Sequence, residues 1–279
     1  MNYSEALDFL YSQMPVFQHK GKAAYKPGLE RIQRLCTYLG EPQNSFKSIH
    51  IAGTNGKGSS AHMIASVLQS VGYQVGLHTS PHLYEFTERL RVNGQEAEKE
   101  WVAEFVTKHQ PFLEELGGSF FEIIVGMTFQ YFVERKVEWA VVEVGLGGRL
   151  DATNILSPEI CLITHIGRDH EAILGDTLPK IATEKAGIMK VQTPVVRGER
   201  QAEIEGVFKE IAQAQNAELF YPESTTKLET DLKGAYQKQN LSGVLKTLEI
   251  LEERGKVTIS DEALKEGLLK VKKQTGLRG

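Results

Sequence analysis

The chain has 279 residues, a formal net charge of −4, and 24% charged against 41% hydrophobic residues. This composition is typical of a globular protein and excludes a disordered chain, and the slight acidic excess argues against a dedicated nucleic-acid binder. The sequence shows no signal-peptide pattern and no apolar run long enough to cross a bilayer, and Cys36 and Cys161 form no metal or redox motif. We therefore expect a cytoplasmic protein without nucleic-acid or membrane partners.

Short β-rich runs alternate with longer amphipathic stretches along the chain. The first 45 residues predict a helix, a loop at His19–Lys22 and a second helix over Leu29–Leu39. The predicted strands are Ser48–Ala52, Gln74–His78, Trp139–Val144, Ile160–His165, Pro194–Arg197 and Glu218–Tyr221. The further predicted helices are Gly58–Val71, Lys99–Leu116, Phe121–Arg135, Thr177–Lys190, Arg200–Gln215, Ala235–Glu252 and Asp261–Lys270, with a polar surface loop over Pro222–Thr230. This alternation predicts an α/β fold, with a mostly parallel sheet covered by helices on both faces.

A glycine-rich run, Gly53-Thr54-Asn55-Gly56-Lys57, follows a predicted strand and opens a predicted helix. Backbone N–H groups in such a turn can hold phosphate oxygens, and Lys57 can reach the β and γ phosphates. The match to the Walker pattern is imperfect, because Ile51 stands at the first glycine position and Gly58 replaces the hydroxyl, which follows at Ser59. A phosphate site is favoured over a plain turn, since a lysine at a helix N-terminus opposes the helix dipole unless an anion binds. The fold is therefore expected to be of the P-loop type.

Two further motifs follow other predicted strands. Glu143 falls near the end of a buried strand, where a carboxylate is costly unless it is paired or binds a metal. An ion pair with Arg149 is one alternative, and a Mg²⁺ role is favoured. His165, Asp169 and His170 gather after the next strand, at the sheet edge where α/β proteins bind ligands.

Two segments carry weaker signals. Lys185 lies on a predicted helix, where its spacing alone predicts an exposed face of glutamates and lysines. The run Thr79–Leu83, followed by Thr87–Gly94, predicts a loop in which Pro81 keeps Ser80 extended at a strand end.

Together these motifs resemble the folylpolyglutamate synthase and dihydrofolate synthase family, a branch of the Mur-ligase-like amide-bond ligases. The resemblance is carried in order by Ala52–Ser59, Thr79–Leu83, Val142–Arg149 with Asp151–Asn154, His165–His170 and Glu184–Ile188. It implies that ATP phosphorylates the carboxylate of dihydropteroate or of a reduced folate's glutamyl tail, and that the amine of L-glutamate then attacks the acyl phosphate. ATP and Mg²⁺ are the implied cofactors, and a monomer is expected.

The resemblance also assigns roles by position. It implies a triphosphate site of Gly53, Thr54, Asn55, Gly56, Lys57, Gly58 and Ser59, with Gln237 and Asn240 near the base. It implies Mg²⁺ ligands among Ser59, Ser80, Glu143, His170 and an N-carbamylated Lys185. It implies a pterin pocket bordered by His82, Leu83, Phe121 and Asp151. Catalysis would then depend on Lys57, His170 and Lys185.

The family has a second, smaller α/β domain, which this sequence is expected to lack. We expect residues 1–279 to form the ATP-binding Mur-ligase-like central domain, with N-terminal helices over 1–45, an α/β core over 46–230 and C-terminal helices over 231–279. Such a chain is expected to bind nucleotide and turn over poorly. Two alternatives stay open, a nucleotide- or pterin-binding module without catalysis and another Mur-like amino-acid ligase.

Overall fold

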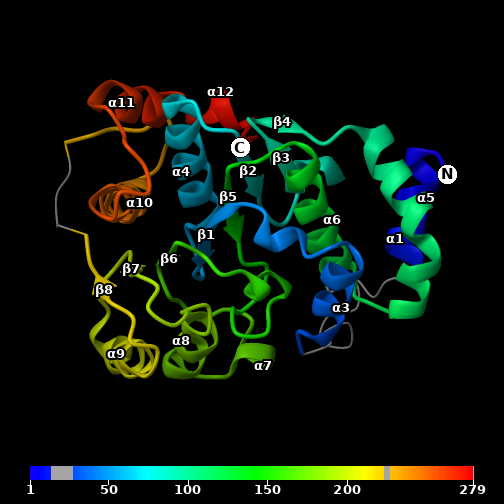
Figure 1. The fold of residues 1–279 in the computed structure, drawn as a ribbon. Coiled ribbons are helices and arrows are strands. Elements are labelled where there is room, and N and C mark those ends of the chain that lie inside the picture. Colours follow the sequence, from blue (N-terminus) through cyan, green and yellow to red (C-terminus); the bar gives the residue numbers. More distant parts are fainter. Residues whose placement is uncertain (14–27, 223–226, 279) are drawn as a thin grey trace.

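A computed structural model describes residues 1–13, 28–222 and 227–278, and within them one eight-stranded sheet organises the fold (Figure 1). The strand order is β4-β3-β2-β5-β1-β6-β7-β8. The strands are β1 Lys47–Ala52, β2 Val75–His78, β3 Leu90–Val92, β4 Gln95–Glu96, β5 Trp139–Glu143, β6 Ile160–Ile163, β7 Val195–Arg197 and β8 Leu219–Phe220. Along the run β2-β5-β1-β6-β7-β8, each strand pairs in parallel with its neighbour. At the other end of the sheet, β3 pairs antiparallel with both β2 and β4. The predicted α/β fold with a mostly parallel sheet is confirmed.

Helices cover both faces of this sheet (Figure 1). One face packs against α4 Lys57–Val71, α10 Gln237–Glu253, α11 Asp261–Leu269 and α12 Val271–Thr275. The other face packs against α6 Phe120–Glu134, with α1 Tyr3–Gln13, α3 Glu30–Tyr38 and α5 Lys99–Leu116 on that side, and against α8 Leu178–Ala186 and α9 Glu205–Ala214. The short helices are α7 Glu171–Leu174, η2 Pro42–Asn44, η3 Phe86–Arg89, η4 Ala152–Ile155 and η5 Ala202–Ile204.

The central strands are buried on both sides, which explains their nearly continuous apolar sequences. In β5, Val141 joins the cluster under α4 and α10, whereas its neighbour Val142 joins the cluster under α6. In the adjacent β1, Ile51 pairs in register with Glu143, the last residue of β5. The same register brings the carboxyl ends of β1, β5 and β6 to one edge of the sheet, where side chains from all three can meet.

The structure corrects several predicted boundaries. The segment 87–94, expected as a loop, instead enters the β3–β4 hairpin, because Asn93 and Gly94 both adopt positive φ (47° and 75°), as a two-residue hairpin turn requires. The helix predicted to reach Lys190 ends at Ala186, before Gly187, a weak helix former. The helix expected from Arg200 begins at Glu205, after the turn η5.

Two predicted loops fall wholly or partly outside the described residues. The loop at His19–Lys22 lies entirely outside them, and the loop at Pro222–Thr230 lies partly outside. Among the helices that the structure does describe, none is both long and apolar enough to cross a membrane.

Candidate functional site

The glycine-rich turn between β1 and α4 has a conformation that requires its glycines. Gly53 has φ 148° and Gly56 has φ 87°, in the region that glycine alone adopts readily. A Cβ on Gly53 would overlap the hydroxyl of Thr164, and a Cβ on Gly56 would overlap the amide of Asn240. Lys57 then starts α4, so the turn leads directly into a helix N-terminus.

The loop after β6 holds this turn from one side. The backbone N–H of Thr54 donates to the carbonyl of His165 at 2.7 Å, and the Thr54 hydroxyl donates to the carbonyl of Gly167 at 3.1 Å. The Thr164 hydroxyl also donates to the carbonyl of Asn55 at 2.7 Å. These bonds satisfy groups of the turn that face the protein, so its shape is set before any ligand arrives.

The first turn of α10 holds the glycine-rich turn from the other side. The side-chain amide of Gln237 donates to the Ser59 hydroxyl at 3.1 Å, and the amide of Asn240 donates to the Gln237 side-chain oxygen at 2.9 Å. Asn240 also packs against Gly56, as the clash of a Cβ there indicates. Two residues distant in sequence are therefore brought to the glycine-rich turn.

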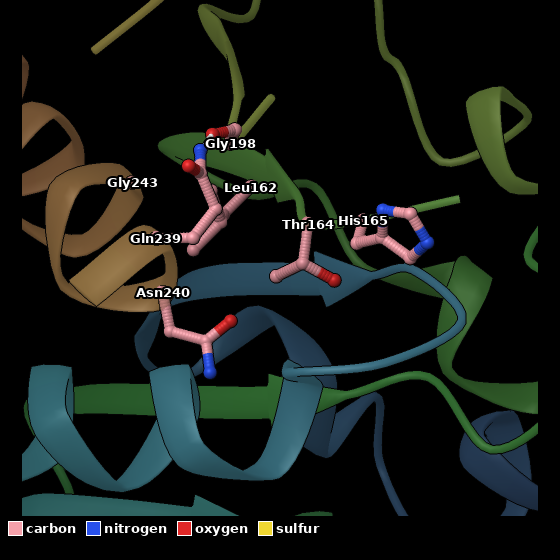
Figure 2. Close-up of a pocket in the computed structure, with 7 residues that line it drawn as sticks. All are labelled: Leu162, Thr164, His165, Gly198, Gln239, Asn240 and Gly243. Carbon is pink, nitrogen blue, oxygen red and sulfur yellow. Dashed lines mark hydrogen bonds between the residues drawn. The ribbon is translucent and has the colours of Figure 1, made fainter. Parts of the chain in front are cut away.

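A small pocket opens beside these residues, between the end of β6 and α10 (Figure 2). Figure 2 shows Asn240 on the α10 side and Thr164 and His165 at the end of β6. The full lining is Leu162, Thr164, His165, Gly198, Gln239, Asn240 and Gly243. It combines hydroxyl, imidazole and amide groups with two glycines, so it offers both hydrogen-bonding groups and bare backbone.

Glu143 lies at the end of β5 and faces the same turn. It is only 5% exposed, its Oε1 lies 4.0 Å from the Lys57 Nζ, and its Oε2 accepts the backbone N–H of Ser80 at 3.3 Å. Burial raises the pKa of Glu143 to about 7, although Lys57 and the Ser80 N–H lower it. The structure thus brings together Lys57, Glu143 and Ser80, three of the residues predicted for the site.

Arg149 is not the partner of Glu143. Its guanidinium lies 2.8 Å from the carboxylate of Glu184 on α8, and its side chain is half exposed. The alternative of a Glu143–Arg149 ion pair is therefore wrong, because the loop after β5 turns Arg149 toward α8.

Lys185 departs from the face that its helical spacing predicts. It is 5% exposed, and its Nζ donates to the carbonyl of Gly53 at 2.8 Å. Burial lowers the pKa of Lys185 to about 8, and the nearby Lys57 lowers it further. The helix can come this close because a Cβ on Gly148 would lie 2.6 Å from the carbonyl of Glu184. The prediction of an exposed lysine is therefore wrong.

His170 occupies the loop that follows β6. It has φ 51°, precedes α7, and its half-exposed imidazole lies 3.5 Å from the carboxylate of Asp169. Across the described residues, no group of three or more His, Cys, Asp or Glu side chains is arranged to hold a metal ion. Only Glu143 and His170 among the predicted Mg²⁺ ligands belong to these residue types, so the Mg²⁺ assignment stays a prediction.

Phe121 and Asp151 line the loop that follows β5. The Phe121 ring packs against Gly145, where a Cβ would overlap it. Asp151 is 5% exposed and accepts the backbone N–H groups of Leu146 at 2.8 Å and Thr153 at 3.0 Å. Burial raises the pKa of Asp151, against the effect of these bonds. Both carboxylate oxygens of Asp151 thus accept hydrogen bonds that hold the loop in its conformation.

The loop after β2 carries His82 and Leu83. Leu83 is 61% exposed, whereas the Nδ1 of His82 accepts a hydrogen bond from the Nε of Arg89 at 2.8 Å. Arg89 and its neighbour Glu88 are almost fully buried on η3 and hold this loop, and the sequence reasoning missed both. The Asn93-Gly94 hairpin signal follows Glu88 and Arg89 by a few residues. It could have indicated that these two charged residues lie in an ordered segment.

Comparison with known proteins defines the class of this chain. A family model described as the Mur ligase middle domain matches residues 51–259. The fold and the glycine-rich turn thus define a Mur ligase middle domain, the ATP-binding domain of amide-bond ligases. The chain is 36% identical over 300 residues to the dihydrofolate synthase/folylpolyglutamate synthase of Bacillus subtilis (strain 168), across 96% of this chain and 68% of that protein. The chain belongs to the folylpolyglutamate synthase/dihydrofolate synthase family.

Solved structures agree with this family. The folylpolyglutamate synthase of Thermotoga maritima matches with a TM-score of 0.82 and 37% identity, over 95% of this chain and 65% of that one. A folylpolyglutamate synthase in complex with AMPPCP and folate matches with a TM-score of 0.86 and 29% identity, over 97% of this chain and 72% of that one. The chain therefore spans about two thirds of the length of these relatives.

Proposed function

We propose that this chain is the ATP-binding part of a ligase that joins L-glutamate to dihydropteroate, to the glutamyl tail of a reduced folate, or to both. The observation that carries the proposal is the contact of Lys57 with the buried Glu143 at the mouth of the glycine-rich turn. A cation and a carboxylate that water barely reaches, beside N–H groups at a helix N-terminus, suit a bound nucleoside triphosphate and its metal ion.

The nucleotide is proposed to bind along the residues from Gly53 to Ser59, with its phosphates over the N-terminus of α4. The base would lie toward Gln237 and Asn240, whose side-chain amides supply hydrogen-bonding groups. A related synthase in complex with AMPPCP supports this assignment.

Mg²⁺ is proposed to bind at Glu143, and the residues present fit it. The buried carboxylate of Glu143 accepts one hydrogen bond, from the backbone N–H of Ser80 at 3.3 Å, and the amine of Lys57 lies 4.0 Å away. Its oxygens therefore keep lone pairs for a cation. Ser80 donates its backbone N–H to Glu143, and its hydroxyl is a proposed ligand because Mg²⁺ prefers oxygen ligands. Ser59, His170 and Lys185 are the further proposed ligands. When bound, Mg²⁺ neutralises the phosphate charge.

Lys185 is proposed to be N-carbamylated. Its low exposure and its pKa of about 8 leave a larger neutral fraction near pH 7.5 than an ordinary lysine has, and a neutral amine is the form that attacks CO₂. The nitrogen lone pair forms the N–C bond, one C=O π pair of CO₂ moves onto oxygen, and the nitrogen loses a proton. The side chain becomes a carbamate anion whose oxygens can bind a metal ion.

The acceptor is proposed to bind near Phe121, whose ring can stack on a flat pterin, with His82, Leu83 and Asp151 at the border. One oxygen of the substrate carboxylate attacks the γ-phosphorus of ATP, and ADP leaves. The amine of L-glutamate then attacks the acyl carbon, an amide bond forms, and phosphate leaves with the bonding electron pair. Lys57 stabilises the phosphoryl charge during the first step, and His170 is the further proposed catalytic residue.

Residues 1–279 are proposed to act as the central ATP-binding domain. The helices of 1–45 and of 231–279 would flank the α/β core of 46–230 that carries most of the site. The relatives are longer than this chain. That a chain of this length turns over is therefore a proposal in its own right, separate from nucleotide binding.

Phosphate release by the chain tests the ligase proposal. We expect release with MgATP to need both L-glutamate and either dihydropteroate or a reduced folate, to rise with bicarbonate, and to accompany a product heavier by one glutamyl residue. Omission of either substrate should lower the rate at least about tenfold. Calorimetry with AMPPCP and Mg²⁺ measures nucleotide binding by the same chain. Binding without turnover would favour the module without catalysis, and neither binding nor turnover would reject both.

A further inference from the structure

Glu88 makes an unusual set of contacts for a carboxylate outside the phosphate site. It is 5% exposed and accepts the backbone N–H groups of Leu83 at 3.0 Å, Tyr84 at 2.9 Å and Glu85 at 2.8 Å. Burial would raise the pKa of Glu88, but these N–H bonds and Arg91 outweigh it and keep the pKa below its usual range. One ionised side chain therefore holds three successive amides of the loop after β2.

That loop also carries three residues of the proposed site, Ser80, His82 and Leu83. Glu88 holds the amide of Leu83 itself, and the backbone N–H of Ser80 reaches Glu143 at 3.3 Å. The ring of His82 is in turn held by Arg89, the residue next to Glu88. The short helix η3 thus restrains the loop at its backbone and at one side chain.

The C-terminal segment Gln274–Arg278 reaches the same carboxylate from the other side. The guanidinium of Arg278 lies 3.6 Å from Glu88 and 2.9 Å from Glu96 of the β3–β4 hairpin. The segment is itself seated closely on that hairpin, because a Cβ on Gly94 would overlap the carbonyl of Gln274. The loop after β2 and the segment after α12 therefore share one buried carboxylate.

We propose, on the basis of the proposed ligase function, that Glu88 is a positioning residue that holds the Ser80–Glu85 loop in register with Glu143 and couples this loop to the docking of Arg278. Glu88 is not one of the residues proposed to bind ATP or the acceptor. It acts through the backbone, because each hydrogen bond to an ionised carboxylate is stronger than one to a neutral amide. Arg278 acts on the loop only through Glu88. Because its own side chain is half exposed, its ion pair with Glu88 contributes less to holding the loop than the three N–H bonds do.

Amide hydrogen exchange resolved over residues 80–85 tests this proposal directly. Glu88→Gln keeps the size of the side chain but loses its charge and one acceptor, and we expect exchange in the loop to be at least about tenfold faster. Arg278→Ala should speed it about two- to fivefold, and Arg278→Lys should restore the native rate. The matched control is Arg254→Ala, which removes an exposed pair with Glu218 and should leave the loop unchanged.

Two binding measurements separate positioning from a merely structural role. In Glu88→Gln, AMPPCP affinity in EDTA should equal that of the native chain, because Gly53–Ser59 is untouched. The gain in AMPPCP affinity on adding Mg²⁺, and the affinity for folate, should each fall about tenfold.

Unchanged loop exchange in both Glu88→Gln and Arg278→Ala would overturn the proposal, as would an equal loss of nucleotide affinity with and without Mg²⁺. Arg278→Ala, a surface change, decides the question if Glu88→Gln does not fold. A native chain that binds neither AMPPCP nor folate would reject the proposed function instead, and the exchange rates would then still decide the role of Glu88.

Discussion

At the scale of single residues, the site is built from charges that burial perturbs in opposite directions. Glu143 has its pKa raised to about 7 and Lys185 has its pKa lowered to about 8, in both cases chiefly by burial. Lys57 acts on both, since its charge favours ionised Glu143 and disfavours protonated Lys185. Groups with perturbed pKa values that gather at one sheet edge favour a functional site there.

Lys57→Ala should therefore weaken AMPPCP binding in the presence of Mg²⁺ by roughly a hundredfold while the fold is kept. The side chain loses a hydrogen bond to the Thr54 carbonyl at 3.1 Å and the contact with Glu143, but no core packing. Calorimetry measures the affinity, and circular dichroism checks the fold. Lys180→Ala is the control, because Lys180 pairs with Asp176 on the surface. Native affinity in Lys57→Ala would contradict the assignment of the phosphate turn.

At the scale of elements, the β3–β4 hairpin connects the antiparallel sheet edge to the end of the chain. Its turn at Asn93-Gly94 lies under the carbonyl of Gln274, and Gly276 packs close to Gly94 in return. The hairpin also carries Glu96, which accepts the hydroxyl of Thr87 at 2.6 Å. The segment Gln274–Arg278 thus packs against the short antiparallel edge of the sheet.

Replacing Gly94 by alanine should cost more than its positive φ alone explains. Gly40 has a similar φ, 85° against 75°, and nothing near its missing Cβ, so Gly40→Ala measures only the backbone strain, about 1–2 kcal/mol. Gly94→Ala should lose at least about 1 kcal/mol more, because the carbonyl of Gln274 must move. Urea unfolding of both variants gives the comparison, and equal losses would argue against close docking of the segment.

At the scale of the whole molecule, three fully buried histidines make the fold sensitive to acid. Burial lowers the pKa of His50, His62 and His78 to about 3. The folded chain keeps these rings neutral, whereas the unfolded chain protonates them below about pH 6.5. Between these values the unfolded state binds more protons, so the free energy of unfolding falls as the pH falls.

His62→Gln isolates one of these contributions. His62 joins α4 to α12 through a contact of 2.7 Å between its Nδ1 and the Thr275 hydroxyl. From pH 6.5 to pH 5 the native chain should lose about 1.6 kcal/mol through this ring, and the variant should lack that loss. The raised pKa of Glu143 acts in the opposite direction, but equally in both proteins. Urea unfolding at several pH values measures the difference, and parallel profiles would refute the prediction.

The elements that bear the site were largely predictable from the sequence. The central strands β1, β5 and β6 and the helix α4 lie within a few residues of their predicted positions, because apolar runs and glycine signals are local. The edge hairpin was missed, since strands of two and three residues show hardly any periodicity. The glycine-rich turn was also predictable, because its positive φ values demand glycine at Gly53 and Gly56.

The sequence by itself thus determined the α/β class, the glycine-rich turn and the residues that resemble a folate ligase. Only the tertiary structure decided which partners those residues have. It buried Lys185 against Gly53, paired Arg149 with Glu184, set Gln237 on Ser59 and joined Glu88 to Arg278. The physical reason is range: burial patterns and backbone preferences act within a few residues, whereas the partner of a charged group depends on strand register and on loops that meet from distant parts of the chain.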